Sequence, residues 1–292
     1  MNKATDTPDS KQVYGMTDEQ LAKRESVYRN DLLAGKTILI SGGGSGIGRT
    51  MAWLCGRLGA TVVICGRKPE RLELTAAPMR SSGLKVETFA CNIRNPDEPA
   101  ALMDKLFSEH GGIDVLVNNA GGQFPQPAID FAAKGWNAVI ETNLTGTWNM
   151  MQAAGRHWRD SSRPGSIVNI ITVVDRGQPG VAHTCAARAG VAALTRTVAV
   201  EWAPFHIRVN CVAPGGIETE GLNNYPPAAL DMLNRSNPML RRGEGWDVAE
   251  AMVYLAAPSG KFITGETLNV DGGGRLWGEF WIAGKPAYFD AA

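Results

Sequence analysis

The stretch "TILISGGGSGIGRT", residues 37–50, decides the fold. A short β-type run leads into a glycine-rich turn and then into an amphipathic segment. The strict pattern G-x-G-x-x-G fails because Ile47 stands where its third glycine is required, but G-x-x-x-G-x-G fits on Gly42, Gly46 and Gly48. Backbone N–H groups in such a turn can approach a pyrophosphate at the positive end of the following helix. A glycine run alone would fit a plain tight turn, but its place at the head of a strand–helix unit favours a dinucleotide site.

The rest of the chain alternates between strand-like and helix-like patterns. One helical example is the recurrence of Val191, Leu194, Val198 and Trp202 every three or four residues. Near-continuous apolar strands joined by helices are typical of a parallel sheet covered on both faces. We therefore predict a single α/β domain of the Rossmann type with a doubly wound, seven-stranded parallel sheet. The expected strands are "TILIS" from Thr37, "TVVIC" from Thr61, "VETFAC" from Val86, "IDVLVNN" from Ile113, "SIVNIIT" from Ser166, "IRVNCV" from Ile207 and "TLNV" from Thr267.

The two ends of the chain depart from this pattern. Residues 1–30 are polar, with one short helical pattern in "TDEQLAKRESVY", and we expect an extension that lies on the domain surface or is partly disordered. Residues 31–292 are predicted to form the single domain. It ends in an aromatic tail from Trp277 to Phe289, which is too apolar to stay in water. We expect this tail at a subunit contact or over a neighbouring site in a homo-oligomer.

Composition excludes several classes of function. The 29 basic and 29 acidic residues give zero formal net charge with no basic patch, so nucleic acid and anionic membranes are not expected as partners. No apolar run is long enough to span a bilayer, and the polar N-terminus does not resemble a signal peptide. The five cysteines are scattered, without a C-x-x-C pair or a Cys/His cluster. We therefore expect no metal site, no disulfide framework and a reducing, cytoplasmic location.

The end of the second expected strand selects the cofactor. An NAD site usually carries an acidic residue about 20 residues past the glycine turn, where it binds the ribose hydroxyls. The run from Thr61 has no acid and ends with Arg67 and Lys68 in that place. Two cations suit the 2′-phosphate of NADPH, which a carboxylate would repel. The sequence therefore predicts NADP(H), and a solvated basic pair at a helix start is the plainer alternative.

Four motifs together carry a resemblance to the short-chain dehydrogenase/reductase family: the glycine turn, "NNAGG" from Asn118, "NLTGT" from Asn143 and "VAPGGIETEG" from Val212. The resemblance runs from Lys36 to about Gly274 and implies a domain that commonly forms homotetramers. It implies that "NNAG" backs the adenosine side of the cofactor and that the segment after the sixth strand holds the nicotinamide amide. Asn92 stands where the family usually has an aspartate near the adenine. The cofactor-binding residues predicted in this way are Gly42, Ser45, Gly46, Ile47, Gly48, Arg67, Lys68, Asn92, Ile93, Asn119, Ala120, Gly121, Pro214, Gly215, Ile217 and Thr219.

The same resemblance places the family's catalytic Asn, Ser, Tyr and Lys on this chain. Asn143 matches the asparagine, and Thr172 stands near the serine, with one residue fewer than usual before the helix. The tyrosine and lysine positions fall on Thr184 and Arg188. Realignment does not restore the tyrosine, because the chain has none between residues 28 and 225.

Within the family the chain resembles the enoyl-CoA reductase branch, namely the peroxisomal trans-2-enoyl-CoA reductases and, less closely, the 2,4-dienoyl-CoA reductases. The shared runs are "CNIRN", "GGQF", "KGWNAVIETNLTGT", "AARAGV" and "FITG". The N-terminal half, including "YRNDLLAGKT", also resembles bacterial citronellol and citronellal dehydrogenases. The resemblance implies a small-molecule substrate, and an acyl-CoA if the first branch applies.

The altered tetrad limits the chemistry. Carbonyl–alcohol exchange needs a group that moves a proton to or from oxygen, and neither a threonine hydroxyl nor a protonated arginine is a suitable base. Hydride addition to a conjugated C=C bond needs instead a donor to the growing oxyanion. Thr184 could donate, Thr172 and Asn143 could support it, and Arg188, one turn further on, would hold the nicotinamide ribose and add positive charge. The α-carbon proton would come from water, Asp175, His183 or Tyr225.

Three functions stay open at this stage. The favoured one is NADPH-dependent reduction of the C=C bond of an α,β-unsaturated acyl thioester or enone. The alternatives are an alcohol or aldehyde dehydrogenase of the citronellol type, with an unrecognised base, and a protein that binds NADPH without turnover. The tetrad residues also have plainer roles, since Thr184 could be only a helix N-cap and Arg188 could pair with a carboxylate.

Overall fold

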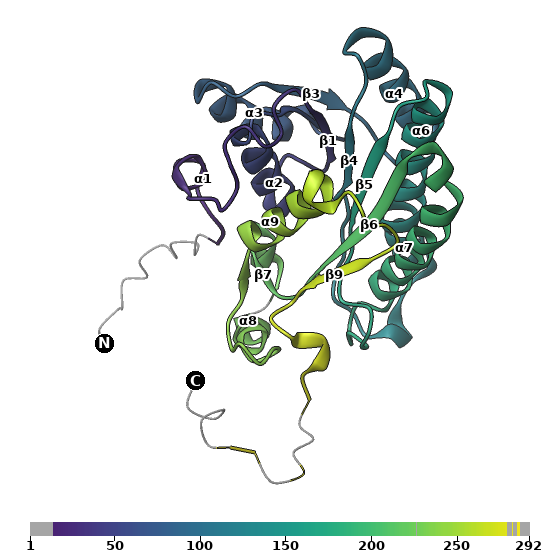
Figure 1. Ribbon diagram of the computed structural model, residues 1–292. Helices are drawn as coiled ribbons and strands as arrows, with labels where there is room; N and C mark the ends of the chain where they lie inside the picture. Colours follow the sequence, from purple (N-terminus) through teal and green to yellow (C-terminus); the bar gives the residue numbers. More distant parts are fainter. Residues whose placement is uncertain (1–13, 226, 279–281, 283–284, 287–292) are drawn as a thin grey trace, which may run out of the picture.

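The seven expected strands form one parallel sheet in the computed structural model, which describes residues 14–225, 227–278, 282, 285 and 286 (Figure 1). The order across the sheet is β3-β2-β1-β4-β5-β6-β9, and each neighbouring pair is parallel. This confirms the predicted fold class. The strands are β1 (Thr37–Ser41), β2 (Thr61–Gly66), β3 (Val86–Ala90), β4 (Val115–Asn118), β5 (Gly165–Ile170), β6 (Ile207–Pro214) and β9 (Thr267–Val270).

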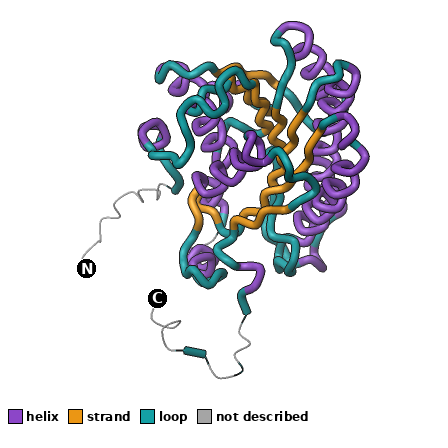
Figure 2. The backbone as a smooth tube through the Cα atoms, viewed as in Figure 1, coloured by secondary structure: helices purple, strands orange, loops and turns teal. Residues whose placement is uncertain are grey.

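Helices cover both faces of the sheet, as the near-continuous burial of its central strands requires (Figures 1 and 2). On one face, α2 (Gly46–Arg57), α3 (Pro69–Ser81) and α9 (Gly245–Ala256) pack around Trp53 and Trp246. On the other face, α4 (Asp97–Glu109), α6 (Gly146–Asp160) and α7 (Ala182–Glu201) pack around Trp158. The carboxyl ends of the strands therefore open between two helical layers, where α/β sheets bind ligands.

The remaining elements lie in the connections. A second, two-stranded parallel sheet, which the sequence patterns did not predict, pairs β7 (Ile217–Glu218) with β8 (Gly243–Glu244). The short helix α5 (Ala133–Ile140) runs through a π-helical segment η2 (Glu141–Thr145) into α6, and α8 (Pro227–Asn234) follows β7. The 3-10 segments are η1 (Ala128–Asp130), η3 (Ala203–Phe205), η4 (Glu220–Asn224), η5 (Pro258–Gly260) and η6 (Gly274–Leu276).

The described part of the N-terminal extension is docked on the α2–α9 layer. It forms α1 (Asp18–Lys23), which begins with a reciprocal capping box between Thr17 and Gln20. Leu21 is fully buried in the core around α2, and the indole Nε1 of Trp53 donates to Asp18 at 2.9 Å. The expected surface extension is therefore held by specific contacts from residue 14 onward.

The C-terminal segment after β9 folds back toward the loop that follows β5. The guanidinium of Arg176 donates to the carbonyls of Gly274 and Trp277, and the indole of Trp277 donates to the carbonyl of Arg235 at 2.9 Å. Most of the predicted aromatic tail, namely residues 279–281, 283–284 and 287–289, lies outside the described residues. Within the described part of the chain, none of the helices has the length and apolarity that a membrane crossing requires.

Candidate active site

The glycine turn is shaped by close backbone contacts at the ends of β1 and β4. Gly42 has φ +68°, and a Cβ there would lie 2.9 Å from the Cα of Ala120. A Cβ on Gly48 would lie 2.3 Å from the carbonyl oxygen of Gly42. Gly46 has φ +53°, in the left-handed region that side chains disfavour. The three glycines of the sequence pattern are thus required by the geometry of the turn.

Hydrogen bonds lock the loop after β4 onto this turn. The Ser41 hydroxyl oxygen accepts from the backbone N–H groups of Asn119 and Ala120, both at 3.1 Å. The Asn119 amide donates to the carbonyls of Ser41 and Gly42, also at 3.1 Å. The side-chain amide of Asn119 therefore joins the two loops.

A cleft opens where these loops meet the ends of β2 and β3. Nine residues predicted to bind the cofactor line it: Gly42, Ser45, Arg67, Lys68, Asn92, Ile93, Asn119, Ala120 and Gly121. Two further cations, Arg71 and Arg94, also line it, and sequence reasoning missed both. The signal for Arg71 was its i,i+4 spacing from Arg67 in "RKPER". With four cations and no carboxylate, the lining of this cleft suits a phosphate-bearing ligand.

The other predicted cofactor residues lie around this cleft. Ile47 and Gly48 belong to the first turn of α2, beneath it. Pro214 ends β6, and the N–H of Gly215 donates to the carbonyl of Val270 at 3.0 Å. Ile217 lies in β7 and lines a second cavity with Asn237 and Asp271. Thr219 faces the glycine turn, since a Cβ on Gly46 would lie 3.8 Å from the Cβ of Thr219.

Asn143 lies in the π-helical segment between α5 and α6. Such insertions redirect side chains and recur at functional sites. The Asn143 Oδ1 accepts from the N–H of Gly122, and Nδ2 donates to the Gly122 carbonyl, both at 3.0 Å. The predicted support of an oxyanion by this amide is therefore not what the geometry favours. The side chain holds the loop after β4, and its backbone carbonyl faces Arg188 at 3.5 Å from Nη1.

Arg188 is a buried cation without a counter-ion. It is only 7% exposed, and it forms no ion pair within the described part of the chain, so the alternative of a carboxylate partner is wrong there. Burial lowers the pKa of its guanidinium from the ordinary value to about 10, so it stays charged at neutral pH. The guanidinium packs on Gly121, where a Cβ would lie 2.1 Å from Nη2. A buried, unpaired charge is costly, which favours a role toward a ligand.

Thr184 is the third residue of α7, whose N-cap is Val181, so the alternative of an N-cap role is wrong. Its side chain is buried beside His183, and Oγ1 lies 3.4 Å from the His183 Nδ1. The same Nδ1 accepts from the Thr184 N–H at 2.7 Å. Burial lowers the His183 pKa, so the ring is held neutral between Phe124 and Phe131.

Thr172 follows β5 by two residues, and its Oγ1 accepts from the Gln178 Nε2 at 3.0 Å. Gln178 also donates to the carbonyl of Val173 and so shapes the loop between β5 and α7. The structure thus joins Asn143, Gly121 and Arg188 directly, whereas Thr172 and Thr184 lie near the two ends of the loop between β5 and α7. Of the candidate proton donors, Asp175 is exposed, and the Tyr225 hydroxyl accepts from Gln123 Nε2 at 2.5 Å.

Comparisons with known proteins cover almost the whole chain. A family profile described as "Enoyl-(Acyl carrier protein) reductase" matches residues 42–274. A peroxisomal 2,4-dienoyl-CoA reductase of Arabidopsis thaliana is 36% identical over 264 residues, covering 87% of this chain and 88% of the relative. A probable 2,4-dienoyl-CoA reductase of Bacillus subtilis is 37% identical over 82% of this chain and 96% of the relative. The solved structure of a citronellol catabolism dehydrogenase (AtuB) from Pseudomonas aeruginosa is 39% identical, with TM-score 0.77, covering 86% of this chain and 99% of that one.

Proposed function

The chain belongs to the short-chain dehydrogenase/reductase family of oxidoreductases, and from this premise we propose that it uses NADPH to reduce the C=C bond of an α,β-unsaturated acyl thioester or enone. Members of the family bind nicotinamide cofactors and act on small molecules. The observation that carries the proposal is the buried guanidinium of Arg188, which has no counter-ion among the residues that the structure describes.

The residues of the cleft fit NADPH rather than NADH. Arg67, Lys68 and Arg71 would hold the 2′-phosphate, and Asn92 with Ile93 would contact the adenine. The glycine turn would hold the diphosphate through its backbone N–H groups. Pro214, Gly215, Ile217 and Thr219 would hold the nicotinamide end. No carboxylate among the lining residues opposes this assignment.

The chemistry needs a site that stabilises negative charge on the acyl oxygen. A nicotinamide bound there would supply the hydride for the β-carbon of the substrate, and a proton from water, Asp175, His183 or Tyr225 would complete the reduction at the α-carbon. Thr184 donates its hydroxyl hydrogen to the acyl oxygen as charge grows there, with Thr172 in support. Arg188 holds the nicotinamide ribose and adds positive charge, and its burial strengthens this effect. Asn143 positions the loop after β4 through Gly122.

The test is a substrate panel. The protein is incubated with NADPH and a set of enoyl thioesters, enones and saturated alcohols, and cofactor consumption is followed by absorbance. Enoyl thioesters or enones should consume NADPH, and saturated secondary alcohols should not reduce NADP⁺. The relatives named 2,4-dienoyl-CoA reductases support an acyl-CoA as the substrate, so coenzyme A thioesters belong in the panel.

The second candidate function is oxidation of a terpenoid alcohol or aldehyde, which the likeness to the citronellol catabolism dehydrogenase supports. It needs a proton acceptor near Thr184, and we propose the neutral His183 ring for this role, because its Nδ1 lies 3.4 Å from the Thr184 Oγ1. Robust alcohol oxidation in the same panel would favour it. Tight NADPH binding without turnover of any substrate would favour a non-catalytic NADPH-binding role. A cytoplasmic location and a homotetramer remain part of the proposal.

A further inference from the structure

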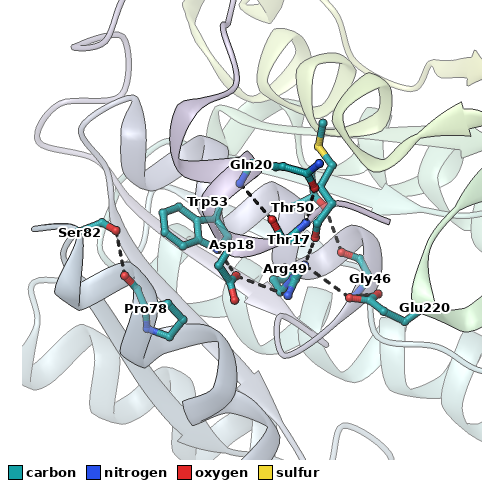
Figure 3. A network of polar contacts seen from close by, with 11 residues as sticks. Thr17, Asp18, Gln20, Gly46, Arg49, Thr50, Trp53, Pro78, Ser82 and Glu220 are labelled. Atoms are coloured by element: carbon teal, nitrogen blue, oxygen red, sulfur yellow. Dashed lines mark hydrogen bonds and ion pairs between the residues drawn. The ribbon is translucent and has the colours of Figure 1, made fainter. Parts of the chain in front are cut away.

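The glycine turn already carries a carboxylate. The backbone N–H of Gly46, the first residue of α2, donates to Oε2 of Glu220 at 3.0 Å (Figure 3). Ser45, the N-cap of α2, makes no side-chain cap of its own. Glu220 opens η4 directly after Thr219 and therefore supplies the cap from a distant part of the chain. It occupies the positive end of the helix dipole, where the diphosphate of a dinucleotide would bind.

Arg49, one turn along α2, fixes this carboxylate. Its Nη2 lies 3.6 Å from Glu220 Oε1, and its Nη1 lies 3.4 Å from Asp18 Oδ1. Its guanidinium also donates to the carbonyl of Met16, and its side chain is only 17% exposed. The largely buried guanidinium of Arg49 is thus shared by two carboxylates. The network ties the N-terminal segment, the glycine turn and η4 together (Figure 3).

We propose that Glu220 competes with the cofactor's diphosphate for the glycine turn and so sets the affinity for the dinucleotide. The proposal rests on the proposed function only in taking a nicotinamide dinucleotide as the ligand. A carboxylate 3.0 Å from the Gly46 nitrogen and a diphosphate on the same donor would repel each other strongly. Cofactor binding therefore requires the Glu220 side chain to leave Gly46.

The displacement also affects the segment that begins with Glu220. Glu220 is the first residue of η4, and Tyr225 is the residue directly after the end of η4. The Tyr225 hydroxyl is hydrogen-bonded to Gln123 in the loop after β4. The segment 220–225 is thus anchored at one end by the turn that binds the diphosphate and at the other by the loop beside Arg188. Release of the first anchor therefore couples cofactor binding to this segment.

The experiment compares Glu220→Gln, which keeps the length of the side chain and removes its charge, with Glu218→Gln. Glu218 lies two residues earlier and pairs with Arg242 at 3.5 Å, away from the glycine turn. Dissociation constants for NADPH and NADH are measured by calorimetric titration. E220Q should tighten both by about five-fold or more, because both cofactors carry the same diphosphate. E218Q should leave both within two-fold.

Thermal unfolding of the cofactor-free protein gives a second readout. E220Q should lower the melting temperature, because the negative charge at the N-terminus of α2 and the ion pair with Arg49 are lost, so stability and affinity change in opposite directions. Glu220→Ala should behave alike. Unchanged or weaker binding of both cofactors by E220Q and E220A overturns the proposal. Failure of the unsubstituted protein and of E218Q to bind either cofactor would instead contradict the proposed function. Arg67→Ala, which should weaken NADPH alone, separates the diphosphate effect from the phosphate preference.

Discussion

The guanidinium of Arg188 packs directly on Gly121, so closely that a Cβ at position 121 would lie 2.1 Å from Nη2. This contact explains why the first glycine of "NNAGG", Gly121, matters. The buried arginine occupies the space that a side chain on the loop after β4 would need. It also links the two halves of the proposed site, since Gly121 lines the cofactor cleft and Arg188 lies behind it on α7.

Gly121→Ala should therefore displace the Arg188 guanidinium and lower turnover of an enoyl thioester by about 10- to 100-fold. Gly122→Ala is the matched control, because a Cβ at that position meets nothing within 4 Å and its N–H to Asn143 is kept. G122A should retain activity within two-fold. Steady-state kinetics and NADPH titration of both variants check this, and a fully active G121A would contradict the assigned role of Arg188.

Arg67→Ala should weaken NADPH by about ten-fold or more and leave NADH nearly unchanged, because a charge-assisted contact to the 2′-phosphate contributes roughly 1.5–3 kcal/mol. Arg71→Ala should act in the same direction, since its side chain lines the same cleft. Arg159→Ala, an exposed arginine on α6 paired with Asp160, is the control. Fluorescence titration with both cofactors measures the preference. Equal losses for NADPH and NADH would remove the idea of a phosphate site.

The sequence could predict the sheet because its seven strands are local apolar runs, and the glycine turn because its spacing is local as well. The close contact between Arg188 and Gly121 could not be predicted, because it depends on the approach of two segments 67 residues apart. Asn143 was identified by its motif, but its partner Gly122 follows from the π-helical segment, which no pattern indicated. Glu220 was missed because its motif position suggested only a loop beyond Thr219.

Arg188→Met should make the cofactor-free protein more stable and less active. Burial lowers the Arg188 pKa from its ordinary value to about 10, so holding the charge costs on the order of 3 kcal/mol at neutral pH. For a base with a lowered pKa, this cost is fully present below the folded-state value and is released only as the pH rises above about 10. The gain in unfolding free energy should therefore be constant from about pH 6 to pH 9.

Arg208→Met is the control for that gain, because the Arg208 guanidinium is satisfied by the carbonyls of Leu255 and Gly260, both at 2.8 Å, and by the Ser166 hydroxyl. R208M should lower the unfolding free energy by about 1–3 kcal/mol, since it leaves these acceptors unpaired. Denaturant unfolding of both variants at neutral pH checks the contrast. Destabilisation by R188M to the same extent would show that Arg188 is a structural cation.

Assembly can be tested on the open edge of the sheet. β9 ends the strand order, and the exposed apolar side chains Tyr254, Phe262 and Leu268 come from α9, β9 and the loop between them. If this edge joins subunits of a homotetramer, Phe262→Asp should lower the mass measured by light scattering at micromolar concentration. Leu74→Asp, at an exposed position of α3, should leave the measured mass unchanged. A monomeric unsubstituted protein would contradict the expected assembly.

Thr184→Val tests whether the enzyme reduces a C=C bond with the help of the Thr184 hydroxyl. The substitution keeps the shape of the side chain and deletes the hydroxyl that lies 3.4 Å from the His183 ring. If the hydroxyl donates to the acyl oxygen, kcat for an enoyl thioester should fall by about 10²–10³ while NADPH binding is unchanged. Thr197→Val, an exposed threonine further along α7 whose hydroxyl bonds only to a helix carbonyl, is the control.

The pH dependence of the reaction rate tests the same mechanism independently. A threonine donor does not titrate, so the rate of enoyl reduction should lack the limb near neutrality that a tyrosine acid–base group produces, and it should fall at alkaline pH only as Arg188 loses its charge near pH 10. Burial lowers the His183 pKa, so the neutral ring should persist through neutrality. Thr184→Tyr restores the missing residue without its lysine, and it should gain no alcohol oxidation because Arg188 cannot serve as the lysine does. Strong alcohol oxidation by the unsubstituted protein, with T184V unimpaired, would reject the oxyanion mechanism in favour of the dehydrogenase.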